Sequence, residues 1–253
     1  MTGRCSIAWW GHATASIAMD GARVLTDPVV TPRAGHLARM APPPPEERAP
    51  CDAVLISHLH IDHLHLRSLR RIEARRVIGP PGLAGLLPPA RRDAVREVEP
   101  GQSVPVGPLT VTAVPAEHDG RRTPWSRARP ALGFLITGSR TVYFAGDTGP
   151  FAGMEALGDA GIDAALLPIW GWGPTLGRGH LDPLTAAQAL TLLRPRAAVP
   201  IHWGTYAPLW VSRRRPPEFL TRPVQEFVDH AGRLAPAVRV AALRPGGPGL
   251  GVP

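Results

Sequence analysis

The chain has 253 residues, of which 44% are hydrophobic and 19% are charged, a globular composition that excludes general disorder. A length near 250 fits one compact α/β unit, so we expect residues 1–253 to form a single domain. No apolar run approaches the roughly 18 residues needed to span a bilayer, and the first residues lack the apolar segment of a signal peptide. We therefore expect a cytoplasmic protein.

The formal net charge is +8. All 28 basic residues that contribute its positive charge are arginine, and the printed sequence contains no lysine. An excess of Arg, Ala, Pro and Gly is typical of a GC-rich genome, which explains the charge without a function. The alternative is a nucleic-acid or anionic-lipid partner. Cys5 and Cys51 are too few for a disulfide framework, and we interpret them as buried thiols in a reducing compartment.

Alternating and β-branched residues in the first third predict strands, with Asp20-Gly21 as a hairpin turn. They cover residues 6–9, 14–19, 23–26 and 53–56. Residues 41–50 contain four consecutive prolines, which favour an extended loop and exclude a helix.

Strands and helices alternate in the rest of the chain. Strands are predicted at 109–114, 132–137, 141–145, 164–167, 197–201 and 238–243. Helices are predicted at 151–160, at 184–193 after the Asp182-Pro183 start signal, and at 216–231 with Gly232 as the stop. Periodicity alone indicates an α/β or α+β fold in which helices cover the sheets.

Four histidines and an aspartate lie within eight residues directly after the strand at 53–56. They are His58, His60, Asp62, His63 and His65. Burying so many polar rings is costly unless they are paired or bind a metal. Imidazole and carboxylate groups suit zinc and other first-row divalent metals. We therefore prefer a metal site to a histidine-rich surface loop.

The pattern His58-x-His60-x-Asp62-His63 resembles the HxHxDH signature of the metallo-β-lactamase superfamily. Further motifs follow in that family's order, each after a predicted strand: His118, Asp147 and His202. The resemblance covers the chain from Trp9 to about His202. It implies a four-layer αββα sandwich of two facing mixed sheets with helices outside.

The same resemblance implies the ligand sets of two divalent metal ions. His58, His60 and His118 resemble the ligands of the first, and Asp62, His63 and His202 those of the second. Asp147 resembles the carboxylate that bridges both. We expect zinc, with Mn or Fe as alternatives that fit the same ligands.

A finer similarity links the chain to a subgroup of the superfamily. It rests on Gly11-His12-Ala13, Thr26-Asp27-Pro28, Gly146-Asp147-Thr148, His180-Leu181-Asp182 and His202-Trp203-Gly204. These motifs resemble N-acyl-phosphatidylethanolamine-hydrolysing phospholipase D and L-ascorbate-6-phosphate lactonase, which both act on phosphate-bearing substrates. His65 departs from the family, which often has Asp there. We expect the helix that follows to lack its usual cap, and we do not make His65 a ligand.

Two metals about 3.5–4 Å apart can hold a bridging hydroxide, and the site then keeps a positive charge that favours an anionic substrate. We therefore expect a dinuclear metal-dependent hydrolase, phosphodiesterase-like or lactonase-like. Its substrate is a phosphorylated, lactone or phosphodiester compound, either a small molecule or a lipid. The candidate proton donor to the leaving group is either Asp62, once released from its metal, or a metal-bound water. His180 is a candidate catalytic residue, with a capping or loop histidine as the alternative.

Several other residues keep two interpretations. His12 either supports the metals from beneath or shapes a turn. Five tryptophans follow predicted ligand strands and together suggest an apolar pocket mouth: Trp125, Trp170, Trp172, Trp203 and Trp210. Arginines near Trp125 and Trp210 form either a solvated surface or an anion clamp: Arg121, Arg122, Arg127, Arg129, Arg213, Arg214 and Arg215. If these loops face a membrane, we expect weak peripheral contact with anionic lipid.

Two rival functions remain. One is a nuclease of the same superfamily, against which the chain shows no basic-aromatic RNA motif, so we do not expect a nucleic-acid partner. The other is a non-catalytic metal-binding interaction module, against which the seven candidate ligands are all present. The sequence does not predict an oligomeric state.

Overall fold

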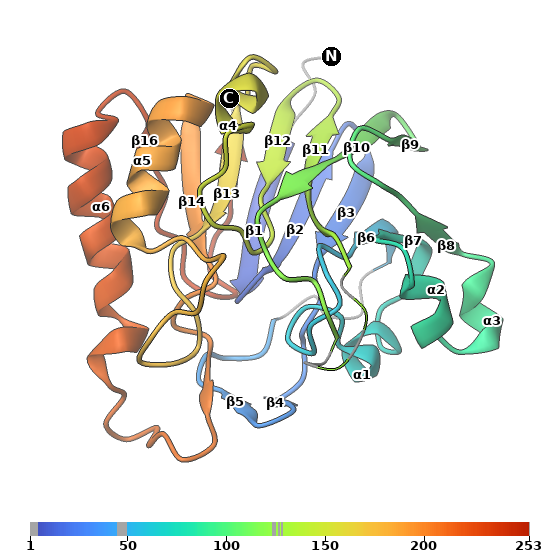
Figure 1. The fold of residues 1–253 in the computed structure, drawn as a ribbon, viewed down its shortest axis with the longest axis horizontal. Helices are drawn as coiled ribbons and strands as arrows, with labels where there is room; N and C mark the ends of the chain where they lie inside the picture. Colours follow the sequence, from blue (N-terminus) through green and yellow to red (C-terminus); the bar gives the residue numbers. More distant parts are fainter. Residues whose placement is uncertain (1–4, 45–49, 123–124, 126, 128, 253) are drawn as a thin grey trace.

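The computed structural model describes residues 5–44, 50–122, 125, 127 and 129–252. The predicted proline-rich loop falls partly outside the described residues, at 45–49, and its described part carries neither helix nor strand. Two facing mixed sheets and a small third sheet make up the strands of the described chain (Figure 1).

The first sheet pairs the amino-terminal strands with the last strand of the chain. Its order is β17 (Leu250–Val252), β1 (Cys5–Gly11), β2 (Thr14–Met19), β3 (Ala22–Thr26), β6 (Cys51–Leu55), β7 (Ala74–Gly79) and β8 (Val95–Glu97). Asp20 and Gly21 form the predicted turn between β2 and β3. Both have positive φ, 53° and 85°, as a two-residue type I′ hairpin requires.

The second sheet is antiparallel at one edge and parallel at the other. Its order is β16 (Arg239–Val240), β14 (Ala197–Ile201), β13 (Ala164–Pro168), β12 (Thr141–Phe144), β11 (Ala131–Thr137), β10 (Leu109–Ala116) and β9 (Ser103–Val106). The third sheet joins β15 (Tyr206–Pro208), β5 (Leu37–Arg39) and β4 (Arg33–Ala34).

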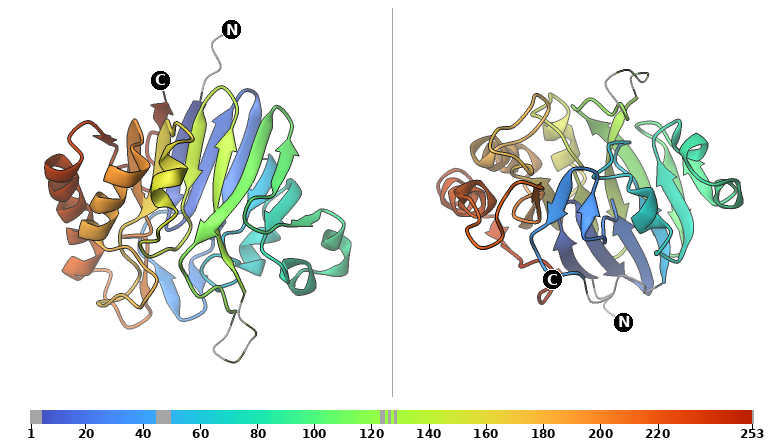
Figure 2. Two further views of the ribbon diagram at one scale, coloured as in Figure 1. Left: turned by 45° about the horizontal axis from the view of Figure 1, so that its top comes forward. Right: turned by 90° about the horizontal axis from the view of Figure 1, so that it is seen from below.

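Apolar side chains of the two large sheets pack face to face and form the central core. Ile7 and Trp9 of β1 share this core with Phe134 of β11 and Phe144 of β12, and all four are almost fully buried. A layer of this kind excludes water from both inner faces, which makes it the main source of hydrophobic stabilisation. Figure 2 shows the two sheets side by side in both views.

Helices cover the outer faces and complete four layers. α4 (Met154–Gly158), α5 (Pro183–Leu193) and α6 (Arg222–Leu234) lie against the second sheet, where Leu190 and Phe227 pack on its buried residues. α1 (Leu66–Leu69) and α2 (Leu83–Leu86) pack on the first sheet, and α3 (Pro89–Arg92) follows α2 (Figure 1). The predicted αββα sandwich is therefore confirmed.

The predicted helix at 216–231 is wrong at both ends. A short 3-10 turn (Glu218–Leu220) precedes α6, which begins at Arg222, and Gly232 lies inside the helix instead of ending it. Glycine costs about 1 kcal/mol in a helix interior, but burial of Phe227 and Ala231 on the inner face continues the helix past it. α6 ends only before Ala235, the residue that precedes Pro236.

Two other predicted elements are shorter than expected. The strand predicted at 238–243 reduces to the two residues of β16, which pairs only with β14 at the edge of the sheet. The helix predicted at 151–160 reduces to α4, because Pro150 and Gly153 delay its start and Gly161, with φ of 67°, follows its end. Among the described residues, no helix is both long enough and apolar enough to cross a membrane.

Candidate metal centre

All candidate ligands follow the carboxyl ends of strands at one edge of the sandwich. His12 follows β1, His58 to His63 follow β6, His118 follows β10, Asp147 follows β12, His180 ends the loop after β13, and His202 follows β14. These strands run in the same direction within each sheet, so their carboxyl ends meet at one edge. Residues up to 190 positions apart are thereby brought together.

Three histidines form the first donor group. Nε2 of His58 lies 2.9 Å from Nδ1 of His60, and Nε2 of His118 lies 3.2 Å from the same nitrogen. Three ring nitrogens that point at one another cannot all be satisfied by sharing protons, because each neutral ring carries only one N–H. A cation at their meeting point satisfies all three, so this group fits a metal ion.

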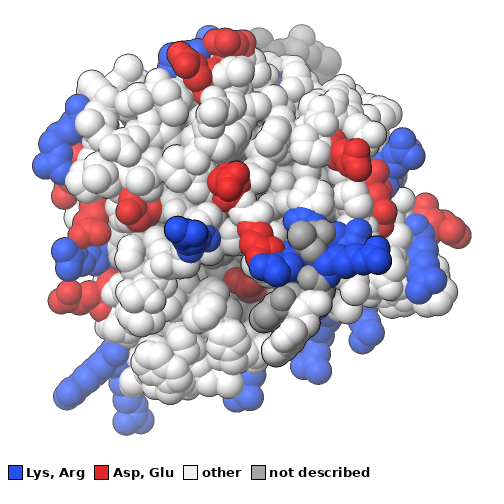
Figure 3. Space-filling model, in the orientation of Figure 1, with Lys and Arg blue, Asp and Glu red and all other residues white. Residues whose placement is uncertain are grey.

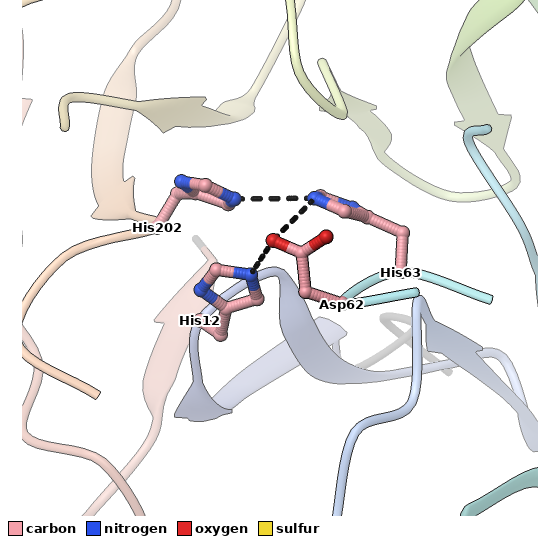
Figure 4. Close-up of side chains that lie close together, drawn as sticks. All are labelled: His12, Asp62, His63 and His202. Carbon is pink, nitrogen blue, oxygen red and sulfur yellow. Dashed lines mark hydrogen bonds and ion pairs between the residues drawn. The ribbon is translucent and has the colours of Figure 1, made fainter. Parts of the chain in front are cut away.

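The second donor group contains His12, Asp62, His63 and His202 (Figure 4). Nε2 of His63 lies 3.1 Å from Nε2 of His202 and 3.9 Å from Oδ2 of Asp62. Nε2 of His12 approaches the same carboxylate oxygen at 3.1 Å. Asp62, His63 and His202 are the ligands predicted for the second metal. His12 lies in the same group and was not predicted as a ligand.

Asp147 lies between the two groups. Its Oδ2 is 3.1 Å from Nε2 of His63, and its Oδ1 is 3.2 Å from Nε2 of His202. It also lies within reach of donors from His58 and His118. Its Oδ1 is buried without a hydrogen-bond partner among the described residues, and such an oxygen is costly unless a cation compensates it.

A buried carboxylate orients the ring of His63. Asp27 is fully buried, and its Oδ2 lies 2.8 Å from Nδ1 of His63. The same carboxylate accepts hydrogen bonds from the backbone N–H and hydroxyl of Ser57, whose Oγ lies 3.0 Å from Nδ1 of His58. These contacts hold both rings with Nε2 directed inward, the arrangement that orients metal-binding histidines in proteins. The motif Thr26-Asp27-Pro28 did not by itself predict this role for Asp27.

Backbone carbonyls orient two more rings in the same way. Nδ1 of His118 lies 2.9 Å from the carbonyl oxygen of Gly179, and Nδ1 of His202 lies 2.8 Å from that of Trp170. An Nδ1–H that donates to a carbonyl leaves Nε2 unprotonated and free to bind a metal. The loop between β13 and α5 supplies both carbonyls and therefore positions both ligands.

Burial favours neutral rings in most of the cluster. It lowers the pKa of His60 to about 4 and that of His202 to about 3, and it holds the pKa of His58 well below its ordinary value. His63 is the exception: burial opposes its charge, but the carboxylates of Asp147 and Asp27 outweigh burial and raise its pKa well above the ordinary value. These carboxylates thus favour positive charge at the centre of the site.

Both acids of the cluster remain ionised. Burial acts to raise the pKa values of Asp62 and Asp147, but the neighbouring histidines hold both well below the ordinary value. Neutral imidazoles and ionised carboxylates are the protonation states in which these groups bind metals. The donors present therefore fit divalent ions of the zinc type.

The backbone of the site is strained at three buried residues. His12, Asp27 and His202 have φ of 54°, 33° and 64°, in the left-handed region that non-glycine residues rarely adopt. Gly146 has φ of 62°, and a Cβ there would lie 2.5 Å from Cβ of Ser57, so only glycine permits this close approach beside Asp147. Strain concentrated in one cluster is typical of a functional site.

His180 lies on the open side of the cluster. Its Nδ1 is 3.1 Å from the carbonyl oxygen of Gly177, and its Nε2 is 3.5 Å from Oδ2 of Asp147. Together with His118 and Asp147 it forms a further group with metal-ligand spacing. His180 also lines the cavity beside the cluster. The structure thus places this ring at the site rather than in a remote loop.

The expectation that α1 lacks a cap is wrong. His65 is its N-cap, and its Nδ1 accepts a hydrogen bond from the backbone N–H of Ser68 at 3.2 Å. The same ring nitrogen lies 2.8 Å from Oγ of Ser68. An imidazole therefore performs the capping that a short acidic side chain usually provides.

Only part of the predicted tryptophan mouth is present among the described residues. Trp172 lines the cavity beside the cluster, whereas Trp170 lines a separate hollow next to Phe219. Trp203 packs on Trp9 of the core, with 5.2 Å between ring centroids. Trp125 and Trp210 are 92% and 76% exposed. Of these five described tryptophans, Trp172 alone lines this cavity. The prediction failed for the others because the end of a strand does not determine where the following loop turns.

The arginines are similarly divided. Arg121 pairs with Asp119 at the surface, and Arg213 donates to the backbone carbonyl of Arg39. Arg122 alone among the described arginines lines the cavity. Figure 3 shows the arginines of one face around its edge and across its middle, with acidic side chains among them. Both cysteines are buried, and burial raises the pKa of Cys5 to about 11 and that of Cys51 to about 12.

Comparison with known proteins agrees with the fold. The family described as beta-lactamase superfamily domain matches residues 22–203. A UPF0173 metal-dependent hydrolase of Methanopyrus kandleri is 32% identical over 252 residues, covering 95% of this chain and 97% of that protein. An uncharacterized protein of Mycobacterium tuberculosis is 34% identical over 221 residues, and the matched region spans 59% of its length.

The architecture is also that of solved structures. Igni18, a metallo hydrolase from the archaeon Ignicoccus hospitalis, superposes with a TM-score of 0.73 over 98% of both chains at 23% identity. Fold and matched family together define a metallo-β-lactamase-fold protein. Within this superfamily the chain belongs to the UPF0173 family, whose members bear the name metal-dependent hydrolase.

Proposed function

We propose that the chain is a metal-dependent hydrolase that holds two divalent ions and acts on an anionic substrate. The observation that carries this proposal is the meeting of two donor groups at Asp147, whose buried Oδ1 has no hydrogen-bond partner among the described residues. Zinc fits the imidazole and carboxylate donors, and Mn and Fe are alternatives for the same set.

In this proposal each ligand keeps the role that the family resemblance implies. His58, His60 and His118 hold one ion, Asp62, His63 and His202 hold the other, and Asp147 contacts both. When bound, such ions lower the pKa of water and polarise the bond to be cleaved. Asp27 and the carbonyls of Gly179 and Trp170 keep the ligand rings in place.

Two residues are proposed to move protons or contact substrate. Asp62 is 8% exposed and lines the cavity, so its carboxylate can accept a proton from the attacking water and pass it to a leaving group. The hydrogen bond from His12 fixes the orientation of this carboxylate. His180 directs Nε2 toward Asp147 and the cavity, where it can donate a hydrogen bond to a substrate oxygen.

The substrate class is proposed from the resemblance and from the charge of the site. Similarity to N-acyl-phosphatidylethanolamine-hydrolysing phospholipase D and to L-ascorbate-6-phosphate lactonase favours phosphodiesters, phosphorylated compounds or lactones. A screen of the metal-loaded protein over lactones, bis(p-nitrophenyl) phosphate, phospholipids and single-stranded RNA separates these classes. Turnover of RNA alone would support the nuclease instead. Full metal loading without any turnover would support the interaction module.

The metal stoichiometry is the direct test. Protein purified without chelator should contain about two metal ions per chain by elemental analysis. Asp147→Asn should lose at least one ion and most of the activity, because the amide has no negative charge to hold two cations together. Asp163→Asn is the matched control, since Asp163 binds the backbone N–H of Thr141 at the other end of β12. A fully active, fully loaded Asp147→Asn protein would overturn the bridging role.

A further inference from the structure

A cavity of about 450 Å³ opens directly beside the proposed metal centre. His60, Asp62, Asp147, His180 and His202 form its floor. The volume is within the range of small-ligand pockets, roughly 300–1,000 Å³. The reacting part of a bound molecule would lie on this floor, so the walls decide which molecules fit.

One wall of this cavity is apolar and largely aromatic. Trp172 and His36 contact each other edge to face, with 5.0 Å between ring centroids. Leu176 lies in the same loop as Trp172, and Ile61, which is 40% exposed, projects from the segment that carries the ligands. Apolar side chains left exposed around a polar floor favour a ligand with an apolar body.

Arg122 is the only arginine that lines the cavity among the described residues. Its Nη1 donates hydrogen bonds to the carbonyl oxygens of Leu59 and Leu64, both at 2.8 Å. Leu59 lies between two ligands of the segment and Leu64 directly follows it, so the guanidinium is fixed relative to the proposed metal centre. A guanidinium held in place loses little further freedom when it binds an anion.

The environment of Arg122 leaves its charge available to a ligand. The two fixed hydrogen bonds go to neutral carbonyls, whereas the neighbouring Arg121 pairs with the carboxylate of Asp119. Burial lowers the pKa of Arg122, with an opposing effect from the carboxylate of Asp62. A half-buried charge of this kind gains more from an anion than an exposed one does.

We propose that Arg122 selects the substrate: it binds an anionic group of a small molecule whose apolar body lies against Trp172 and His36. The inference rests on the proposed function for the position of the reacting bond. It adds the class of substrate, a small molecule that carries both an anionic group and an apolar aryl or acyl body. Arg122 is a specificity-determining residue and takes no part in bond cleavage.

Binding of benzenesulfonate to the full chain, as purified with its metals, tests this proposal by isothermal titration calorimetry. Methyl phenyl sulfone is the neutral probe of similar shape. Wild-type protein should bind the sulfonate more tightly than the sulfone. Arg122→Gln should weaken sulfonate binding by roughly tenfold or more, the scale of one charge-assisted contact, and leave sulfone binding unchanged. Arg122→Lys should lose less, because it keeps the charge.

Arg121→Gln is the matched control, since it removes the adjacent guanidinium outside the cavity, and it should bind both probes like the wild type. Three outcomes would overturn the proposal. Wild type and Arg122→Gln could bind the sulfonate equally well, or both glutamine variants could lose sulfonate binding to the same extent. The third is a wild type that binds the sulfonate no more tightly than the sulfone. Loss of both probes together in Arg122→Gln, with Arg122→Lys no better, would make Arg122 a structural residue and also overturn it. The assay needs no turnover, so a protein that binds through Arg122 and hydrolyses nothing contradicts only the proposed function.

Discussion

His180 lies beside the proposed ligands, and a single substitution can test whether it contacts the substrate or binds a metal. Its Nε2 faces Asp147 at 3.5 Å, while its Nδ1 is held by the carbonyls of Gly177 and Arg178. Burial opposes its charge, but the hydrogen bond with Asp147 outweighs burial and raises the pKa of His180. The ring can therefore present a proton to the cavity without belonging to either proposed ligand set.

We expect His180→Ala to keep about two metal ions and a normal melting temperature, and to lower turnover by roughly 10²–10⁴-fold, the usual scale for a lost acid–base or oxyanion contact. Elemental analysis and steady-state kinetics on the same preparation measure both. His230→Ala is the control, because His230 lies on α6 and contacts Arg233. If metal and activity disappear together, His180 is instead a ligand in the group with His118 and Asp147.

At the residue scale, the pattern of the sequence predicted which residues meet but not what supports them. The seven predicted ligands lie in overlapping groups because each belongs to a segment that follows a strand, and strand ends can be located from hydrophobic runs. Asp27 belongs to the site only because β3 lies beside β6, which brings it to His63 across 36 positions. One feature of the sequence could have identified Asp27 as part of the site. Its carboxylate lies between an apolar strand and Pro28, where an unpaired acid would be costly to bury.

At the scale of single elements, the short helix α1 connects the metal-binding segment to the first sheet. His65 caps it, and Ser68 in its first turn also accepts a hydrogen bond from the backbone N–H of Val30. Leu69 packs in the outer core with Val54 of β6. The cap therefore fixes the end of the loop that carries Asp62 and His63.

His65→Ala should destabilise the protein by about 1 kcal/mol, the usual cost of removing an N-cap side chain. His65→Asp restores a short acceptor at the same position and should recover most of this loss. Urea unfolding curves give the comparison, with equal metal content expected in all three proteins because His65 is not in any donor group of the described chain. A midpoint for His65→Ala equal to that of the wild type would show that the cap is dispensable.

Strands with long buried apolar runs were predictable, and strands that lack such runs were not. β2 coincides with its predicted range and β14 with the range 197–201 because both lie inside a sheet and are almost wholly buried. β7 reads Ala-Arg-Arg-Val-Ile-Gly, which has no alternation, and only its last three residues are buried. β4, β5 and β15 are two or three residues long and exist through pairing across the fold.

At the scale of the whole molecule, the residues of the proposed metal centre come from both large sheets. His12 and the segment from His58 to His63 belong to the first sheet, and His118, Asp147 and His202 belong to the second. Few backbone contacts duplicate this connection at the same edge. The N–H of Leu132 donates to the carbonyl of Ser57, and the N–H of His202 donates to that of His12. Bound ions would therefore add to the apolar core and to these hydrogen bonds in holding the two layers together.

Chelation should consequently lower the stability of the entire fold and not only abolish activity. An ion that binds only the folded state stabilises it by about 2.7 kcal/mol at a free concentration 100 times its Kd. For a chain of this size each kcal/mol shifts the melting temperature by about 2–4 °C, so removal of each ion should lower it by roughly 5–10 °C. Without the ions, Asp62 and Asp147 also lose the positive charge that compensates their burial.

Differential scanning calorimetry before and after treatment with EDTA measures this shift, and added zinc should reverse it. Asp147→Asn provides the internal comparison: its melting temperature should respond less to EDTA, because it starts with fewer ions and one less buried negative charge to compensate. Asp163→Asn should respond like the wild type. An unchanged melting temperature in a sample shown by elemental analysis to be metal-free would mean that the core alone joins the two sheets and that the metal centre serves only the chemistry.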